Sequence, residues 1–215
     1  MKKFLTTAVL SLTLVAAMLP AAAAADSNYT TCMAVISEQR TVQAQAHEAA
    51  QAMRQMGYEE SSAYIQTAKA TWNEAQQEIA AYNRLAKYTD EDIRILATAV
   101  YYEAGSTTDQ LREYVAQVVL NRVGDSRFPN SIRGVITQPG QYAGKYATVE
   151  STQAAKNASS INYASSVTAA KKAMMGRVAM PSNVVFQANF TQGKGVWKSV
   201  YFNSGWFSST SYFCY

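Results

Sequence analysis

The chain has 215 residues, of which 48% are hydrophobic and 16% charged, and its formal net charge is +4. Its one histidine is His47, so the residues that follow cannot build a Ser-His-Asp triad, a Cys-His pair or a histidine-ligated zinc centre. The sequence also lacks a glycine-rich phosphate loop and a dinucleotide-binding fingerprint, which excludes the commonest nucleotide-dependent enzymes.

The first 25 residues are typical of a bacterial secretory signal peptide. Lys2 and Lys3 precede an apolar run at 4–19, and the alanines before Asp26 fit an A-x-A cleavage site. The apolar run is short for a membrane-spanning helix, and no later run is long enough either. We therefore expect a mature bacterial protein that is secreted and has no transmembrane segment after cleavage.

Residues 26–88 are rich in Ala, Gln and Glu and predict an antiparallel, coiled-coil-like helical hairpin. Gly57 marks the turn between two runs whose seam positions alternate by three and four residues. The predicted seams comprise Val35, Gln39, Val42, Ala46, Ala49, Met53 and Met56 in the first helix, and Ile65, Ala68, Trp72, Ala75, Ile79 and Tyr82 in the second. Such a hairpin suits a spacer, a lid, an arm that docks a protein partner, or a self-association surface.

The next helix is predicted to end in a carboxylate. Thr89 and Asp92 form a capping-box pattern at its start, and Gly105 supplies its stop. Between them runs a core-facing stripe at 3,4 spacing, formed by Ile93, Leu96, Ala97, Val100 and Ala104. Glu103 thus falls in the last turn beside two tyrosines, where the helix dipole and apolar neighbours raise a carboxyl pKa. It is either a general acid or a solvated glutamate near a helix end.

Weaker patterns describe the remainder of the chain. They predict a buried helix at 111–123 and a shorter helix at 167–175. Residues 148–161 are polar and predict a surface loop or a fraying helix. Two β-branched and aromatic runs, 183–190 and 196–202, flank a glycine-rich turn and predict a small β-hairpin. The expected fold class is therefore α+β and mostly helical.

Carboxylates are scarce in this second region, and only Glu103 combines a last-turn position with apolar and aromatic neighbours. A general acid among tyrosines and tryptophans suggests sugar chemistry, because aromatic faces line saccharide grooves. An ordinary glycosidase needs a second carboxylate. Asp125 and Glu150 are the candidates for that role, and neither is convincing.

Five short blocks stand out in this region. They are AVYYEAG at 99–105, VVLNRV at 118–123, FPNSI at 128–132, GVI at 134–136 and QPGQY at 138–142. In this order they resemble the catalytic domain of SleB-type cell wall hydrolases, the spore-cortex-lytic enzymes and their vegetative relatives. The resemblance implies a compact, lysozyme-like, mostly helical catalytic domain at 89–215. The signal peptide at 1–25 and the helical hairpin at 26–88 precede it and are no part of the resemblance.

The resemblance also implies a reaction, a lytic transglycosylation of peptidoglycan glycan strands that uses no metal or cofactor. Glu103 matches the family's catalytic glutamate, which protonates the oxygen between N-acetylmuramic acid and N-acetylglucosamine. The same group then acts as a base while the muramoyl 6-hydroxyl attacks its own C1, which gives a 1,6-anhydro sugar. Because the nucleophile belongs to the substrate, one carboxylate suffices. We place Tyr102, Gln141 and Tyr142 in the substrate groove.

Three further positions bear on this interpretation. Asn121 and Arg122 match the family, either in the groove or through hydrogen bonds that fasten a helix end. Ser211 stands where the family's C-terminal block carries a histidine, so a polar groove contact is missing or altered. The alternatives are a muramidase that hydrolyses the same bond and a non-catalytic cell-wall or spore-coat binding protein. The Ser211 departure favours the binding protein.

Two features of the whole chain complete the expectations. Cys32 and Cys214, the only cysteines, predict a disulfide in an oxidising compartment, or else two free thiols. From Ser151 to Tyr215 the chain has no Asp or Glu but six Lys and Arg residues. This basic third suits an anionic partner such as cell-wall polymer or a membrane surface, or it only aids solubility. No nucleic-acid motif is present, so nucleic acid is not an expected partner.

Overall fold

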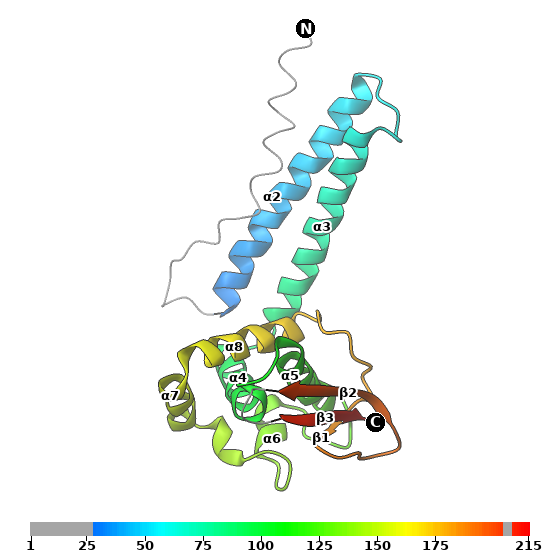
Figure 1. The fold of residues 1–215 in the computed structure, drawn as a ribbon. Helices are drawn as coiled ribbons and strands as arrows, with labels where there is room; N and C mark the ends of the chain where they lie inside the picture. Colours follow the sequence, from blue (N-terminus) through cyan, green and yellow to red (C-terminus); the bar gives the residue numbers. More distant parts are fainter. Residues whose placement is uncertain (1–27, 204–207) are drawn as a thin grey trace. The chain divides into compact units, whose positions relative to one another are not determined.

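The computed structural model describes residues 28–203 and 208–215, so the predicted signal peptide lies outside the described residues. The chain divides into two compact units, Met1–Ala86 and Lys87–Tyr215. The described part is mostly helical with one small antiparallel sheet, which confirms the predicted fold class (Figure 1). None of its helices combines the length and apolar character needed to cross a membrane.

The first unit is a helical hairpin of α2 (Asn28–Gln55) and α3 (Ala63–Leu85), as predicted (Figure 1). The Asn28 side-chain amide donates to the Leu85 carbonyl oxygen over 3.0 Å, which brings the start of α2 beside the end of α3. Gly57 occupies the left-handed region at φ +81°, as the turn requires. Ser62 caps α3 by accepting a hydrogen bond from the Ile65 amide.

The seam of this hairpin differs in part from the heptad prediction. Ala46, Met53 and Ile65 are buried as expected, whereas Met56 and Trp72 are 44% and 41% exposed. In α2 the buried set includes Ile36 and Ala50, each next to a predicted position, and Cys32, which precedes the predicted seam. A straight α-helix drifts by roughly 20° per heptad relative to a strict seven-residue repeat, so a seam extrapolated from Val35 to Met56 moves to neighbouring residues.

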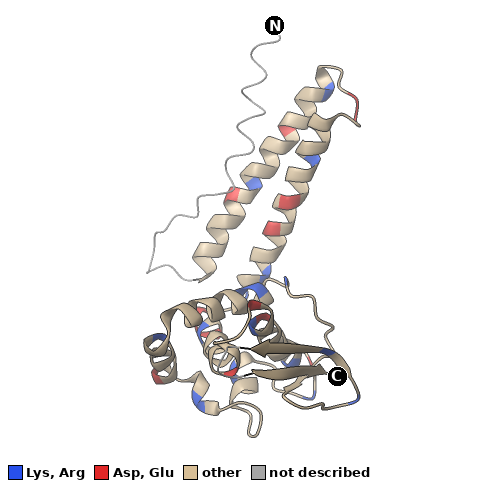
Figure 2. Cartoon of the chain, viewed as in Figure 1, with Lys and Arg blue, Asp and Glu red and all other residues tan. Residues whose placement is uncertain are grey.

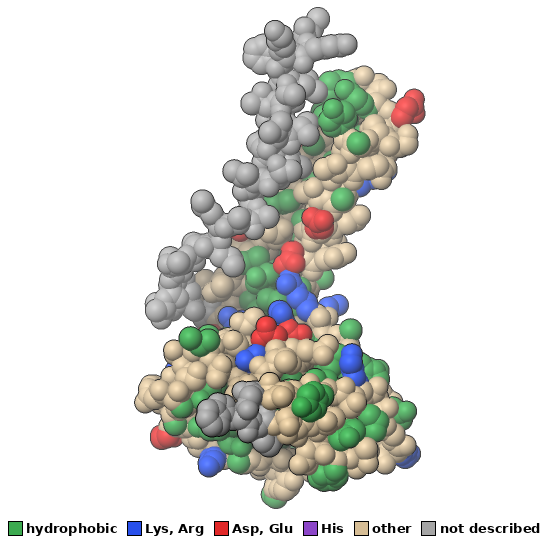
Figure 3. Space-filling view, in the orientation of Figure 1, with side chains coloured by type: hydrophobic (Ala, Val, Ile, Leu, Met, Phe, Trp, Pro, Cys, Tyr) green, Lys and Arg blue, Asp and Glu red, His purple; other side chains and the backbone are tan. Residues whose placement is uncertain are grey.

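The end of the hairpin where α2 and α3 are joined carries exposed hydrophobic side chains (Figure 3). Met56, Tyr58 and Tyr64 are each more than 40% exposed, and the two tyrosine rings meet edge to face at 5.4 Å. Nearby, Glu60 forms ion pairs with Arg54 and Lys69 on the surface. The partner or self-association role predicted for the hairpin stays a prediction.

The second unit is built around α4 (Asp90–Ala104). Around it pack the helices α5 (Asp109–Val123), α6 (Ile132–Thr137), η2 (Gly144–Ala147), α7 (Val149–Ala158) and α8 (Ser160–Met174). Every residue from Ile95 to Val100 is therefore buried, which is wider burial than the predicted stripe. The capping box is confirmed, because the Thr89 and Asp92 side chains each accept the other's backbone N–H at 3.0 Å. Residues 148–161 are thus mainly helical, with Thr148 and Ser159 as N-caps.

The sheet has three strands in the order β1-β3-β2, all antiparallel: β1 (Phe186–Ala188), β2 (Val196–Asn203) and β3 (Ser208–Cys214). The predicted pairing of 183–190 with 196–202 is therefore wrong, because β3 lies between them. The glycine-rich turn packs instead against the chain end, where Lys194 N–H donates to the Tyr215 carbonyl over 2.6 Å. A Cβ at Gly193 would collide with that same carbonyl oxygen.

The charged residues of the second unit are unevenly distributed between its strands and its helices. The one charged residue of the three described strands is Lys198 on β2, whereas both signs occur on the helices and along the hairpin (Figure 2). On β2, Lys198 lies over the Tyr114 ring at 5.6 Å and over the Trp197 ring at 5.9 Å. The basic C-terminal third thus includes a lysine held over aromatic faces, and its predicted anionic partner stays a prediction.

Candidate active site

Glu103 lies in the last turn of α4, as the sequence predicts, and is exposed to solvent. The helix end is held by Arg112 of α5, whose Nε and Nη2 both donate to the Gly105 carbonyl oxygen at 3.3 and 3.0 Å. Gly105 keeps a right-handed conformation. Glycine is required because a Cβ would collide with the Tyr101 carbonyl oxygen, rather than because of a left-handed stop.

The carboxyl of Glu103 has the electrostatic character of a general acid. Burial raises its pKa above the ordinary value, and the positive charge of Arg122 opposes that rise. Surface exposure and a desolvated carboxyl coexist because the residue is open on one side while protein atoms crowd it on the others. Such a carboxyl holds its proton at higher pH than a free glutamate.

Aromatic rings flank this carboxyl. The rings of Tyr102 and Tyr146 stack at 4.7 Å with an interplanar angle of 7°, and Tyr101 meets Tyr102 edge to face at 5.3 Å. The Tyr102 hydroxyl donates to the Ser151 carbonyl oxygen over 3.1 Å, which fixes the ring. The charge of Glu103 raises the pKa of Tyr146, in addition to the larger effect of burial. Tyr146 therefore lies beside the carboxyl, although no sequence block pointed to it.

A polar network on α4 brings η2 and α7 to this place. The Arg94 guanidinium donates to the Ala147 and Thr148 carbonyl oxygens at 3.0 and 2.9 Å and to the Thr152 hydroxyl at 2.8 Å. Thr98 and Thr152 share a buried hydrogen bond of 2.9 Å. These contacts join segments more than 50 residues apart, which is why local patterns could not place Tyr146.

Arg122 interacts electrostatically with Glu103 and is only 4% exposed. Its Nε donates to the Val185 carbonyl oxygen over 2.6 Å, and its guanidinium carbon lies 5.2 Å from the ring centroids of both Phe128 and Tyr142. The neighbouring Asn121 amide donates to the Pro181 and Val184 carbonyl oxygens. Asn121 and Arg122 therefore both hold the segment before β1 against α5. This matches the second alternative predicted for them, hydrogen bonds that fasten a helix end.

The two groove residues predicted after α6 differ in their surroundings. Burial raises the pKa of Tyr142 to about 12, with an opposing effect from Arg122 and a reinforcing one from Glu103, so its hydroxyl stays neutral. Gln141 is exposed in a turn, where its backbone N–H donates to the Gln138 carbonyl oxygen over 3.3 Å. The structure thus brings Tyr142 to the neighbourhood of Glu103 and shows no contact between Gln141 and that carboxyl.

Neither candidate for a second carboxylate perturbs Glu103. Asp125 is bound by Arg127, which lowers its pKa to about 2. Glu150 is exposed in the first turn of α7. Among the described residues, the charged group that shifts the pKa of Glu103 is Arg122. The same residues contain no group of three metal-ligating side chains.

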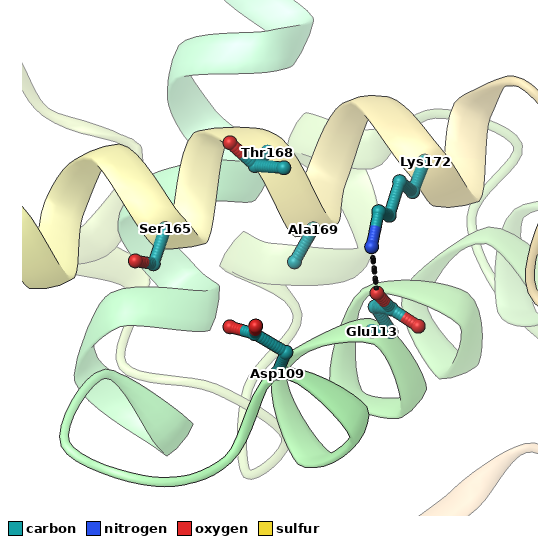
Figure 4. A pocket seen from close by; sticks show the side chains of 6 residues that line it. All are labelled: Asp109, Glu113, Ser165, Thr168, Ala169 and Lys172. Atoms are coloured by element: carbon teal, nitrogen blue, oxygen red, sulfur yellow. Dashed lines mark hydrogen bonds and ion pairs between the residues drawn. The ribbon is translucent and has the colours of Figure 1, made fainter.

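A cavity of about 110 Å³ lies elsewhere in the unit, between α5 and α8 (Figure 4). It is lined by Asp109, Glu113, Ser165, Thr168, Ala169 and Lys172. Both acids are paired, Glu113 with Lys172 at 2.6 Å and Asp109 with Arg112 at 2.7 Å. The cavity is small for a saccharide, and its carboxylates are neutralised by cations. We therefore assign the candidate active site to the open surface around Glu103.

Two further predicted features concern the cysteines and Ser211. Cys32 and Cys214 are both buried, and each belongs to a different unit, so the disulfide stays a prediction. Ser211 is half-buried on β3 opposite Val200, and the groove contact that it was predicted to lose or alter is untested.

Comparison with known proteins identifies the class. Residues 106–209 match the family described as Cell Wall Hydrolase, a span that begins just after Glu103 and ends in β3. The second unit therefore contains a cell wall hydrolase domain.

Three relatives narrow this assignment. The chain is 41% identical over 64 residues to a spore cortex-lytic enzyme of Bacillus subtilis, covering 30% of this chain and 21% of the relative. It is 42% identical over 59 residues to the Halalkalibacterium halodurans enzyme of that name (27% and 18% covered) and over 52 residues to that of Bacillus cereus (24% and 20%). The chain thus spans about a fifth of the length of these relatives. No solved structure matches it significantly. The domain belongs to the cell wall hydrolase family and is distantly related to the spore cortex-lytic enzymes.

Proposed function

We propose that this protein is an exported lytic transglycosylase that cleaves the glycan strands of peptidoglycan between N-acetylmuramic acid and N-acetylglucosamine. One observation carries the proposal. Glu103 is a solitary carboxyl with a raised pKa, flanked by tyrosines and Arg122, and no second carboxylate shifts its pKa. Family membership supplies the substrate class, because a cell wall hydrolase acts on wall polymer.

In the first step, Glu103 donates a proton. The protonated carboxyl gives its proton to the glycosidic oxygen, and the bond between that oxygen and C1 breaks with its electron pair on the oxygen. Desolvation favours the neutral acid before this transfer, because it penalises the carboxylate. A raised pKa therefore keeps a larger fraction of the enzyme in the reactive form near neutral pH.

In the second step, the same carboxyl group acts as a base. Glu103 is now a carboxylate and accepts the proton of the muramoyl 6-hydroxyl as that oxygen bonds to C1. The product is a 1,6-anhydro sugar, and the glutamate regains its proton for the next cycle. A hydrolase of the ordinary kinds needs a second carboxylate to activate water or to attack C1. The paired state of Asp125 and the exposure of Glu150 support the one-carboxylate route.

The aromatic residues suit an extended amino-sugar polymer. The stacked rings of Tyr102 and Tyr146 offer a flat platform beside Glu103, and sugar rings pack their C–H faces on such surfaces. The neutral Tyr142 hydroxyl can donate a hydrogen bond to a substrate oxygen. We assign Gln141 to the rim of the groove, because its side chain is exposed in the adjoining turn.

The test is mass spectrometry of the fragments that the mature protein releases from purified peptidoglycan, with Glu103→Gln in parallel. The proposal predicts anhydromuramoyl ends from the wild type and none from the variant. Reducing ends would keep Glu103 as the acid and replace transglycosylation by muramidase hydrolysis. Binding to the wall with no fragments from the wild type would identify a wall-binding protein and overturn the enzyme assignment.

A further inference from the structure

Arg122 differs from the neighbouring arginines of its unit in having no ion-pair partner. Arg94, Arg112, Arg127 and Arg133 each form an ion pair with an Asp or Glu, and three of these four pairs involve an exposed carboxylate. Among the described residues, no carboxylate lies within ion-pair distance of Arg122, although it is the least exposed of the five. A buried cation without a paired anion is costly, so its retention calls for a reason.

The side chain is also fixed in place. Phe128 and Tyr142 each lie 5.2 Å from the guanidinium, and the Val185 carbonyl oxygen accepts its Nε–H. Cation–π contacts and one hydrogen bond to the backbone hold the guanidinium without neutralising its charge. The charge therefore has a defined position that does not depend on substrate binding.

Glu103 is a group whose pKa is lowered by this charge. Its carboxyl interacts electrostatically with Arg122, yet the two do not form an ion pair. The other ionisable groups that interact with it, Tyr142 after α6 and Tyr146 on η2, have raised pKa values and stay neutral. Arg122 thus provides the positive charge opposite the carboxyl.

We propose that Arg122 is the positioning residue of this site, whose clamped guanidinium stabilises the carboxylate that Glu103 becomes after it gives up its proton. This rests on the proposed function of Glu103 as acid and then base. A direct ion pair would keep the glutamate ionised and remove its acid strength. A charge beyond ion-pair distance leaves the neutral acid accessible and still lowers the energy of the anion between the two proton transfers.

The variants are Arg122→Gln, which removes the charge, and Arg122→Lys, which keeps it. Arg127→Gln is the matched control, because Arg127 also lies over the Phe128 ring, at 5.7 Å, but is paired with Asp125. The first readout is the rate of fragment release against pH. The second is the pKa of Glu103 measured by carboxyl ¹³C NMR without substrate, which does not depend on cleavage.

Arg122→Gln is expected to lower the rate on the order of 10- to 100-fold and to raise the pKa of Glu103. Because activity falls as Glu103 loses its proton, a higher pKa moves the alkaline limb of the profile to higher pH. Arg122→Lys should recover part of the rate with its alkaline limb close to that of the wild type, and Arg127→Gln should change neither readout.

Equal losses in both Arg122 variants, with the alkaline limb and the pKa of Glu103 unchanged, would reduce Arg122 to a structural residue and overturn the inference. If the wild type releases no fragments, the proposed function fails. The NMR titration of wild type and Arg122→Gln would then still decide whether the two charges are coupled.

Discussion

The helical hairpin and the hydrolase unit bury their side chains in different ways. Of the seven buried polar residues among the described ones, six lie in the hydrolase unit, and the exception is Asn28 at the start of the hairpin. The hairpin seam is otherwise apolar and made largely of alanines, while its ion pairs lie on the surface. The hydrolase unit instead buries arginines that bind backbone carbonyl oxygens.

This difference indicates which part of the chain holds a defined geometry at a cost in folding stability. Buried polar groups add little net stability and are costly when unpaired, so their concentration around α4 and α5 indicates a demand beyond packing. Several of them hold elements of the unit in place: Arg112 the end of α4, Arg122 the segment before β1, and Thr98 with Thr152 the start of α7. In the hairpin, the ion pairs of Glu60 with Arg54 and Lys69 lie on the surface.

The largest expected effect tests the centre of the comparison. Glu103→Gln removes the acid and should slow wall lysis by roughly 10²- to 10⁴-fold, the usual contribution of a general acid. The rate is measured as the fall in turbidity of purified sacculi. Glu150→Gln is the control, because Glu150 is exposed on α7, and it should lyse the wall at the wild-type rate. Loss of activity in the control would mean that a second carboxylate takes part.

The hairpin should respond to packing alone. Ile65 is fully buried, so Ile65→Ala should destabilise α2 and α3 by about 2–5 kcal/mol, because it leaves a cavity. Trp72 is 41% exposed, and Trp72→Ser should have a much smaller effect despite the larger side chain that it removes. Hydrogen exchange of the backbone amides of both helices measures the change. Similar losses of helix stability in both variants would show that Trp72 belongs to the buried seam.

The buried and surface arginines provide a direct contrast. Arg112→Gln leaves the Gly105 carbonyl without its donors at the end of α4 and should cost about 1–3 kcal/mol of local stability. Arg54→Gln, which breaks an exposed pair with Glu60 on the hairpin, should cause only a slight change. Urea titration followed by hydrogen exchange reports each unit separately. Equal effects would show that burial of the arginine is not what matters.

Aromatic pairs occur in both units, and only one flanks a carboxyl. Tyr146→Ala removes the ring stacked on Tyr102 and should raise the KM for peptidoglycan fragments by about 2- to 10-fold, which corresponds to the usual worth of one aromatic pair. Tyr146→Phe should retain the wild-type value. Tyr64→Ala breaks the edge-to-face pair of the hairpin and should leave KM unchanged.

The smallest effect concerns stability against pH. Burial raises the pKa of Glu103 in the folded state, so this group favours folding below its unfolded pKa and loses that contribution as pH rises through the folded value. The Glu103→Gln protein should therefore be more stable than the wild type at neutral pH, and the two should converge under acidic conditions. Thermal melts across this range check the sign. A variant less stable than the wild type at neutral pH would contradict a desolvated carboxyl.

Local patterns predicted local features well. The capping box of Thr89 and Asp92 and the position of Glu103 in the last helical turn depend on residues close in sequence, and the structure has both. Strand pairing was mispredicted because β3 carries a weak strand pattern and accepts partners on both edges. Tyr146 and Arg112 were missed because their contacts to α4 are set by tertiary packing. A search for arginines near predicted helix ends could have found Arg112 but not Tyr146.

The central claim is that one carboxylate suffices because the nucleophile belongs to the substrate. The most direct measurement is digestion of purified peptidoglycan in H₂¹⁸O, followed by mass spectrometry of the released ends. The account predicts anhydro ends without ¹⁸O, because no water enters the product. Incorporation of one ¹⁸O at each new reducing end would show that water attacks C1 and would contradict the account.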